Sequence, residues 1–418
     1  MLSTLRDAWR IPDLRKKIIF TLLMLFIYRL GSFISVPYID TAILAQYIQD
    51  GGMLGFYDIF AGGNFSNFTI FAMSITPYIN ASIIMNLLTF AIPALERLSK
   101  EGEDGRKKLA QYTRYLTVVL ALVQALGMTL TFQQIMTERT WFTITLAILT
   151  VTAGTAFLMW LGEQITENGI GNGISLIIFV SIISRLPFAL KGLWEYVQVG
   201  TLNIFSLVLF FLFALLVIVF VIAVQEGQRR IPVQYSKRVV GRKMYGGQST
   251  HIPLKVNMSG VIPVIFASSI TMFPATLANF FPNSGVANWI VRYFGWGTTV
   301  TTILYISLII AFTFFYTAIT FNPIDIANNL KKNGGFIPGI RPGRPTTDYI
   351  NKSVTKLTLF GGIFLAAVAT VPIILGNVMN VNLQFGGTSL LIVVGVAIES
   401  IKQLESQMMM RHYNGFLK

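Results

Sequence analysis

Long apolar stretches separated by shorter polar segments make up most of the chain. A helix that crosses about 30 Å of hydrocarbon needs about 20 mostly apolar residues. The backbone in lipid must satisfy its own hydrogen bonds, and runs such as LVLFFLFALLVIVFVIAV lack the alternation of a membrane β-barrel strand. We therefore predict ten helical spans, at 18–36, 70–92, 114–133, 142–161, 173–190, 204–224, 258–280, 299–321, 355–375 and 387–403.

Positive charges are divided unequally between the two sides that these spans define. Of the 32 Lys and Arg residues, 27 lie in the two termini, in the segments after spans 2, 6 and 8, or at the adjoining span edges. The other side holds Arg139, Lys191 and Arg292, with Arg29 and Arg185 near span ends. Positive residues stay in the cytoplasm, so we predict cytoplasmic termini and cytoplasmic loops at 93–113, 225–257 and 322–353. The loop at 162–172 should share that side but carries no Lys or Arg.

Composition places the chain among integral membrane proteins and removes several kinds of chemistry. Hydrophobic residues make up 54% and charged residues 12% of the 418 residues, about half the charge of a soluble chain. There is no cysteine, and the two histidines are His251 and His412. No G-x-x-x-x-G-K-[ST] phosphate loop and no H-E-x-x-H motif occurs. We therefore expect no enzyme activity, no cofactor and no metal site.

The first apolar stretch begins like a signal peptide, with a basic segment before IIFTLLMLFI. Tyr28, Arg29 and Leu30 follow it, and no small-residue cleavage site occurs. We interpret the stretch as a retained span. Arg29 then either snorkels to the outer interface or pairs inside the bundle.

Two apolar segments differ from ordinary loops or spans. Residues 53–66 are too short to span, yet Leu54, Tyr57 and Phe60 have helical spacing before Gly62 and Gly63 break the run. This predicts a short helix that dips into the protein or lies on the membrane surface. The second predicted span contains Pro77, so we expect a kink.

Isoleucines and uncharged polar residues within the spans have ordinary explanations as well as functional ones. Ile75, Ile79 and Ile83 recur every four residues and share a helix face, which is typical of lipid contact or bundle packing. Embedded polar residues such as Asn86, Gln124 and Ser268 are typical of hydrogen bonds between helices. We take Ile309 as an example of a lipid-facing isoleucine.

The long basic loops, 225–257 and 322–353, mix Gly, Pro and apolar residues with Arg and Lys. Two interpretations stay open on composition alone. The charges either serve topology only, or they form a docking surface for an acidic or RNA-bearing partner.

Nine segments in order along the whole chain resemble the SecY family, the channel subunits of the bacterial protein-conducting translocon. They are GSFISVPYID (31–40), PYINASII (77–84), EGEDGRKKLAQYTRY (101–115), FLMWLGEQITENGIGNGIS (157–175), GQRRIPVQYSKR (227–238), QSTHIPLKVNMSGVIPVIFASS (248–269), NPIDIANNLKK (322–332), PGIRPG (338–343) and FGGTSLLIVV (385–394).

The resemblance implies an all-α integral membrane protein with ten transmembrane helices in two inverted five-helix halves around a central pore. The halves would be residues 1–190 and 204–403, with a cytoplasmic tail at 404–418. The implied function is to move unfolded secretory polypeptides across the bacterial cytoplasmic membrane and to release membrane segments laterally into lipid.

The resemblance also assigns roles to residues. The plug, a re-entrant helix closing the outer funnel, falls on 53–66 with Leu54, Tyr57, Phe60 and Gly62. The lateral gate lies between spans 2–3 and spans 7–8, with Asn86, Gln124 and Ser268. Partner docking falls on Arg242, Lys243 and Arg341. The pore ring falls on Ile75, Ile79, Ile178, Ile265 and Ile392.

The implied partners are SecE and SecG, the motor ATPase SecA, the ribosome, signal sequences, unfolded polypeptides and membrane lipid. A secondary transporter, also built from inverted repeats, is the alternative. It would need embedded charges and helices broken at the midplane, and the sequence offers little of either.

The charge distribution generates a topology prediction. Single cysteines placed in the predicted cytoplasmic loops should be shielded from an impermeant reagent added outside the cell, and the background is clean because the chain has no cysteine. Efficient labelling of Val240→Cys from outside would contradict the predicted orientation.

Overall fold

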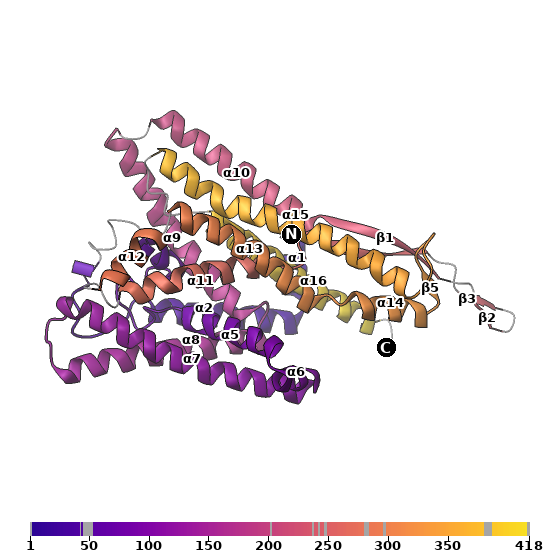
Figure 1. Ribbon diagram of the computed structural model, residues 1–418, viewed down its shortest axis with the longest axis horizontal. Coiled ribbons are helices and arrows are strands. Elements are labelled where there is room, and N and C mark those ends of the chain that lie inside the picture. Colours follow the sequence, from indigo (N-terminus) through magenta and orange to yellow (C-terminus); the bar gives the residue numbers. More distant parts are fainter. Residues whose placement is uncertain are drawn as a thin grey trace.

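The computed structural model describes residues 2–41, 43–44, 53–200, 203–235, 238–240, 243–245, 249–279, 284–295, 298–379 and 387–415. Figure 1 shows a bundle of long helices with a small sheet at one end. The N-terminal helices are α1 (Leu2–Arg10), α2 (Pro12–Gly31), α4 (Met53–Ala61), α5 (Thr76–Ala91), α6 (Pro93–Lys100), α7 (Glu103–Thr131), η1 (Phe132–Ile135), α8 (Trp141–Asn168) and α9 (Gly173–Gln198). The later ones are α10 (Ile204–Glu226), α11 (Ile262–Asn279), α12 (Gly285–Phe294), α13 (Thr299–Thr320), α14 (Pro323–Lys332), α15 (Arg344–Met379) and α16 (Gly387–Gly415).

Each of the ten predicted apolar stretches overlaps one of these helices, and the helical membrane fold class is confirmed. Among the described residues, seven helices are long and apolar enough to cross a membrane, or eight if α5 and α6 form one bent span. The count of ten spans and their division into two inverted halves stay predictions. Helix α16 continues to Gly415, through most of the predicted tail at 404–418.

Lipid-facing surface is most evident on α10. Leu212 and Leu215 leave 61% and 62% of their surface exposed. An apolar helix this exposed is stable only against lipid or a partner. Ile309, taken above as lipid-facing, is completely buried, so that expectation was wrong. Ile303, on the same helix α13, is 60% exposed instead.

The second predicted span begins later than expected. Residues 64–75 form turns, and α5 starts at Thr76 with Ile75 as its N-cap. Pro77 lies in the first helical turn, where its missing N–H has no helical partner to lose. The predicted kink at Pro77 is therefore wrong. The break lies at Ile92–Pro93 instead, where α5 and α6 meet at 100°.

The two basic loops are joined by a sheet that the charge pattern did not predict. Strand β1 (Gln228–Tyr235) pairs antiparallel with β4 (Ser249–Lys255) on one side and with β5 (Gly335–Phe336) on the other. Strands β2 (Arg238–Val240) and β3 (Lys243–Tyr245) form a separate hairpin.

A small core fixes this sheet against helices α14 and α15. Ile231 and Val233 alternate with exposed residues along β1, and they pack with Leu254, Leu330 and Ile350. The alternation in RIPVQ and HIPLK is the period-two signal of a half-buried strand, and it was the clue available in the sequence.

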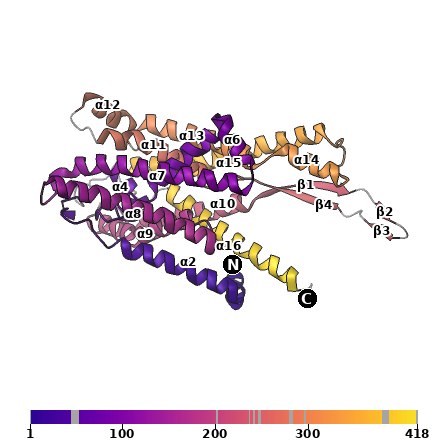
Figure 2. The ribbon, with the colours of Figure 1, turned by 90° about the horizontal axis from the view of Figure 1, so that it is seen from below.

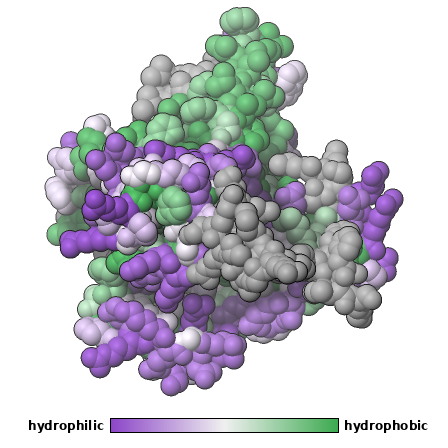
Figure 3. All heavy atoms as spheres, turned by 90° about the vertical axis from the view of Figure 1, so that its right-hand side faces the viewer, coloured by the Kyte–Doolittle hydropathy of each residue, from purple (hydrophilic) through white to green (hydrophobic). Residues whose placement is uncertain are grey.

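The sheet, α6, α14 and both marked chain ends lie in the right-hand half of Figure 1, and Figure 2 shows the strands projecting beyond the helices. Figure 3 looks onto this end. Hydrophilic residues gather over much of the face, and apolar residues project at its top, where α10 runs in Figure 1. The exposed basic residues here include Arg229, Arg230, Lys331, Lys332 and Arg341.

Candidate functional site

A cavity in the middle of the bundle collects residues from segments far apart in the sequence. The cavity has a volume of about 20 Å³, which is enough for one or two water molecules. Its lining is mainly apolar. The lining residues are Tyr57, Phe60, Ser74, Ile75, Thr76, Ile79, Ile178, Ile265, Ser268, Ser269 and Met272.

Four of the five isoleucines assigned to the pore ring line this cavity. Ile75 and Ile79 stand one turn apart at the start of α5, and Ile79 N–H donates to Ile75 O at 3.0 Å. Ile178 comes from α9, and Ile265 from the first turn of α11. Ile392, in α16, is fully buried in the same hydrophobic core but does not line the cavity.

Helix α4 covers the cavity from one side through Tyr57 and Phe60. The predicted short helix in 53–66 is therefore present, although the Leu54 side chain lies outside the described residues. The Tyr57 hydroxyl donates to Met73 O at 2.9 Å, which ties α4 to the turns before α5.

Glycines let the end of α4 approach its neighbours closely. Gly62 and Gly63 have φ of +68° and +88°, where other residues are strained. A Cβ on Gly62 would lie 2.8 Å from Ser181 Cα, and one on Gly63 would lie 2.9 Å from the Arg185 guanidinium. The predicted helix break at Gly62 is thus also a close contact with α9.

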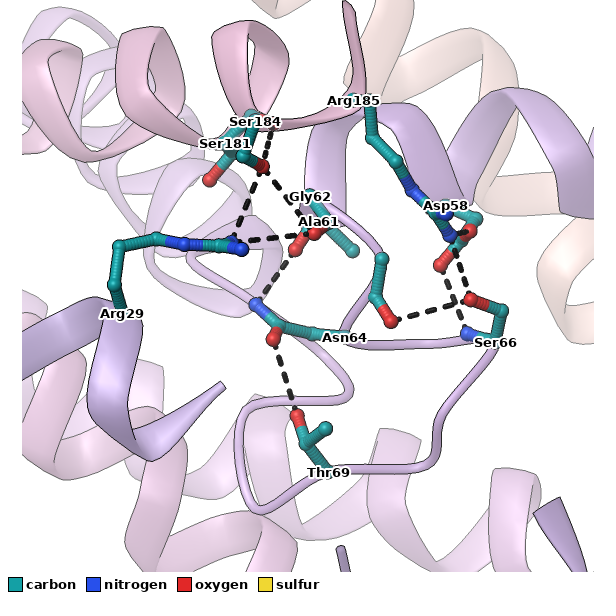
Figure 4. A network of polar contacts seen from close by, with 11 residues as sticks. Arg29, Asp58, Ala61, Gly62, Asn64, Ser66, Thr69, Ser181, Ser184 and Arg185 are labelled. Atoms are coloured by element: carbon teal, nitrogen blue, oxygen red, sulfur yellow. Dashed lines mark hydrogen bonds and ion pairs between the residues drawn. The ribbon is translucent and has the colours of Figure 1, made fainter. Parts of the chain in front are cut away.

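A charge pair beside the cavity, formed by a buried aspartate and a partly buried arginine, was not predicted from the sequence. Arg185 of α9 and Asp58 of α4 form an ion pair, with side chains 22% and 6% exposed (Figure 4). Asp58 Oδ1 accepts the Ser66 N–H at 2.8 Å, and Arg185 Nη2 donates to Ser66 Oγ at 2.6 Å. The available signal was an acidic residue and an arginine within apolar segments, which is costly in a membrane unless they are paired.

Arg29 also points inward. Its Nη1 donates to Ser184 Oγ at 3.1 Å and, at a longer 3.5 Å, to Gly62 O (Figure 4). Of the two alternatives for Arg29, the structure favours pairing inside the bundle.

The predicted lateral-gate residues come from three helices, α5, α7 and α11, and differ in exposure. Ser268 lines the cavity, and its hydroxyl donates to Ile265 O in its own helix at 2.9 Å. Asn86 is exposed and Gln124 is buried in α7. Helix α5 packs against α11, and across the same region Phe90 of α5 meets Phe315 of α13 at 6.0 Å between ring centroids. This ring contact is apolar, and the role of the three polar residues stays a prediction.

The predicted docking residues lie in the basic loops. Arg341 is exposed a few residues after β5. Arg242 lies outside the described residues, as does the side chain of Lys243.

Comparison with known proteins agrees with the resemblance drawn above. The sequence model of the SecY family matches residues 69–401. The protein translocase subunit SecY of Halalkalibacterium halodurans is 48% identical over 431 residues, and that of Bacillus subtilis is 47% identical over 434, each alignment covering both chains completely.

Two solved structures share the fold. One, described as a protein-conducting channel, has a TM-score of 0.67 at 19% identity, covering 94% of this chain and 92% of its own. Sec61 in a canine ribosome-channel complex has a TM-score of 0.64 at 18% identity, with the same coverage.

Proposed function

This chain belongs to the SecY family, and from that premise we propose that it forms a protein-conducting channel. It moves unfolded secretory polypeptides across the cytoplasmic membrane of a bacterium and releases apolar segments sideways into lipid. The observation that carries the proposal is the convergence of Ile75, Ile79, Ile178 and Ile265, from three separate helices, on one small cavity under α4. Together with Ile392, these isoleucines form the pore ring and residues 53–66 the plug. The lateral gate lies between spans 2–3 and spans 7–8, which include α5 and α11.

The physics of the cavity fits that role. A pore that accepts chains of any sequence cannot depend on specific hydrogen bonds, and branched apolar side chains make a seal without a binding site. A narrow apolar neck loses its water when empty, which blocks ions.

The lining argues against the two other classes. A coupled transporter uses embedded charges at its substrate or ion site, whereas the charged pair Asp58–Arg185 lies off the cavity, whose lining contains no acidic or basic residue. The same lining offers hydroxyls but no histidine or carboxylate for catalysis. We therefore infer a passive channel rather than an enzyme.

The partners follow from the family. We propose association with SecE and SecG, with SecA, and with the ribosome, whose complex with Sec61 supports the last of these. The hydrophilic end in Figure 3 is the proposed docking side. Both marked chain ends lie in the same half of Figure 1, and we propose that this side faces the cytoplasm.

Export in a living cell tests the proposed function. Expressed in Bacillus subtilis while the resident SecY is depleted, the chain should restore secretion of a reporter carrying a signal sequence. A reporter without its signal sequence is the control and should stay inside. Normal amounts of the chain in the membrane together with no secretion would contradict the proposal.

The seal predicts ion leakage in pore-ring variants. Ile75→Ser, Ile178→Ser and Ile265→Ser each place a hydroxyl in the cavity, so water and ions should enter without a translocating chain. Purified variants should show single-channel currents in planar bilayers, and weaker signal sequences should be accepted. Deleting 57–65 should leak as well, though neighbouring apolar residues then fill part of the gap.

The matched control for the seal is Ile303→Ser, because Ile303 is 60% exposed on α13. Ile392→Ser should leak less than Ile265→Ser, because Ile392 does not line the cavity. Equal tightness of the pore-ring variants and the control would show that the isoleucines are ordinary packing.

Charge reversal predicts the docking role. Arg341→Glu, or Arg242→Glu with Lys243→Glu, leaves several other positive charges in each loop, so orientation should persist. Affinity for SecA or the ribosome should fall, and each lost phosphate contact to ribosomal RNA should lower the salt dependence of log K by about 1. Arg106→Glu, an exposed charge at the start of α7, is the control. If binding and export are unchanged in these variants, the positive charges of the loops serve membrane topology only.

A further inference from the structure

Helix α4 is attached to the bundle by charge as well as by apolar contact. Arg185 of α9 pairs with Asp58 near the middle of α4 and also donates to Ser66 Oγ at 2.6 Å, beyond the glycine break. Asp58 in turn accepts the Ser66 N–H at 2.8 Å. One guanidinium therefore holds both arms of the turn at Gly62–Gly63, as Figure 4 shows.

None of these attachments involves α11. The polar partners described for residues 57–66 come from α2, α9, the adjoining segment 69–73 and Thr76 at the start of α5. Among them, Tyr28 OH lies 2.6 Å from Ser181 Oγ and accepts from Asn64 at 3.0 Å. Across the cavity, α11 offers Ile265, Ser268, Ser269 and Met272, and none of these is charged.

The two kinds of contact respond differently to displacement. Apolar contacts between α4 and its neighbours can be replaced by lipid or by an apolar segment of a passing chain at little cost. A buried charge that loses its partner has no such substitute and is left unpaired in a low-dielectric site. The ionic attachment, rather than the apolar one, therefore sets the cost of moving α4.

We propose that Arg185 is a gating residue, whose bonds to Asp58 and Ser66 latch α4 to α9 and set the threshold that a polypeptide must exceed to displace it. This inference rests on the proposed channel function. Because the latch lies wholly within α4, its turn and α9, parting of the α5–α11 seam leaves it intact. Displacement of α4 is then a separate step.

The position of α4 can be measured without any substrate. Phe60 lines the cavity on α4, and in this cysteine-free chain Phe60→Cys is a single reporter for a maleimide reagent. The full chain is purified in detergent micelles with its associated subunits, and the labelling rate of Cys at position 60 is compared between the Phe60→Cys parent and variants of the ion pair. Arg185→Met removes the cation. Asp58→Asn removes the negative charge but keeps the Oδ1 acceptor for the Ser66 N–H.

Both single variants should label at least about tenfold faster than the Phe60→Cys parent, since Arg185→Met leaves the buried Asp58 carboxylate unpaired and Asp58→Asn removes the ionic partner of the partly buried Arg185. The double variant should fall well short of the product of the two effects, because it removes a single shared interaction. Lys191→Met, an exposed lysine on the same helix, should label like the parent.

Export separates a latch from simple damage. Arg185→Met should raise secretion of a reporter with a weakened signal sequence and leave a strong signal unaffected, whereas a merely misfolded channel would lose both. If Arg185→Met does not accumulate in the membrane, the labelling rate and the export of the two reporters are measured for Asp58→Asn instead, and these results decide whether the latch exists.

Labelling within twofold of the parent in the single variants, or fully multiplicative effects in the double variant, would overturn the latch. The channel proposal is judged separately. If the unmodified chain fails to export, that proposal fails while the labelling still tests the attachment of α4. If the unmodified chain exports and labelling never changes, only the latch is lost.

Discussion

The apolar lining of the small central cavity is the constraint on which the rest of the structure depends. Water needs two to four polar partners to be stable in a buried space. The isoleucines around this cavity supply none, and the few polar groups of the lining are uncharged hydroxyl residues such as Ser268 and Ser269. The lining must also accept any passing side chain, so it cannot gain specificity from hydrogen bonds. Apolar side chains that seal equally well against every sequence do not hold a neighbouring helix in one fixed position. The position of α4 therefore has to be determined by contacts outside the cavity.

The Asp58–Arg185 pair supplies that positional information at a location where it does not compromise the seal. A buried ion pair adds little net stability compared with apolar packing, yet removing one partner costs about 3–5 kcal/mol. The pair therefore contributes orientation more than stability, because it forms in only one orientation of α4 relative to α9. Gly62 and Gly63 are required for the same reason, since a side chain on either would separate α4 from Ser181 or Arg185. The ion pair and the two glycines therefore fix the position of α4 over the apolar lining of the cavity.

The apolar stretches could be predicted because lipid requires about 20 mostly apolar residues for each spanning helix. That requirement is visible in the sequence without knowledge of any tertiary contact. The start of α5 could not be predicted, because the turns at 64–75 are as apolar as a helix and are fixed by contacts such as Ile70 N–H to Ile34 O at 3.0 Å. The sheet was missed because charge was used to interpret 225–257, although Ile231 and Val233 alternate as strand residues do. Asp58 and Arg185 lie 127 residues apart, and no local pattern reports such a contact.

The sheet links the exposed basic end to the helices around the cavity. Only Gly227 separates α10 from β1, and β4 leads through residues 256–261 into α11, which carries Ile265 and Ser268. Val256 N–H donates to Gly227 O at 2.9 Å, extending the pairing of β1 and β4 to the ends of the two strands nearest the helices. A load applied to the sheet therefore acts on α10 and α11 together, because its strands are hydrogen-bonded to each other. Helix α4 is bonded to α2 and α9 instead, and α10 packs against α9, so the same load reaches α4 through helix packing and not through the hydrogen bonds of the sheet.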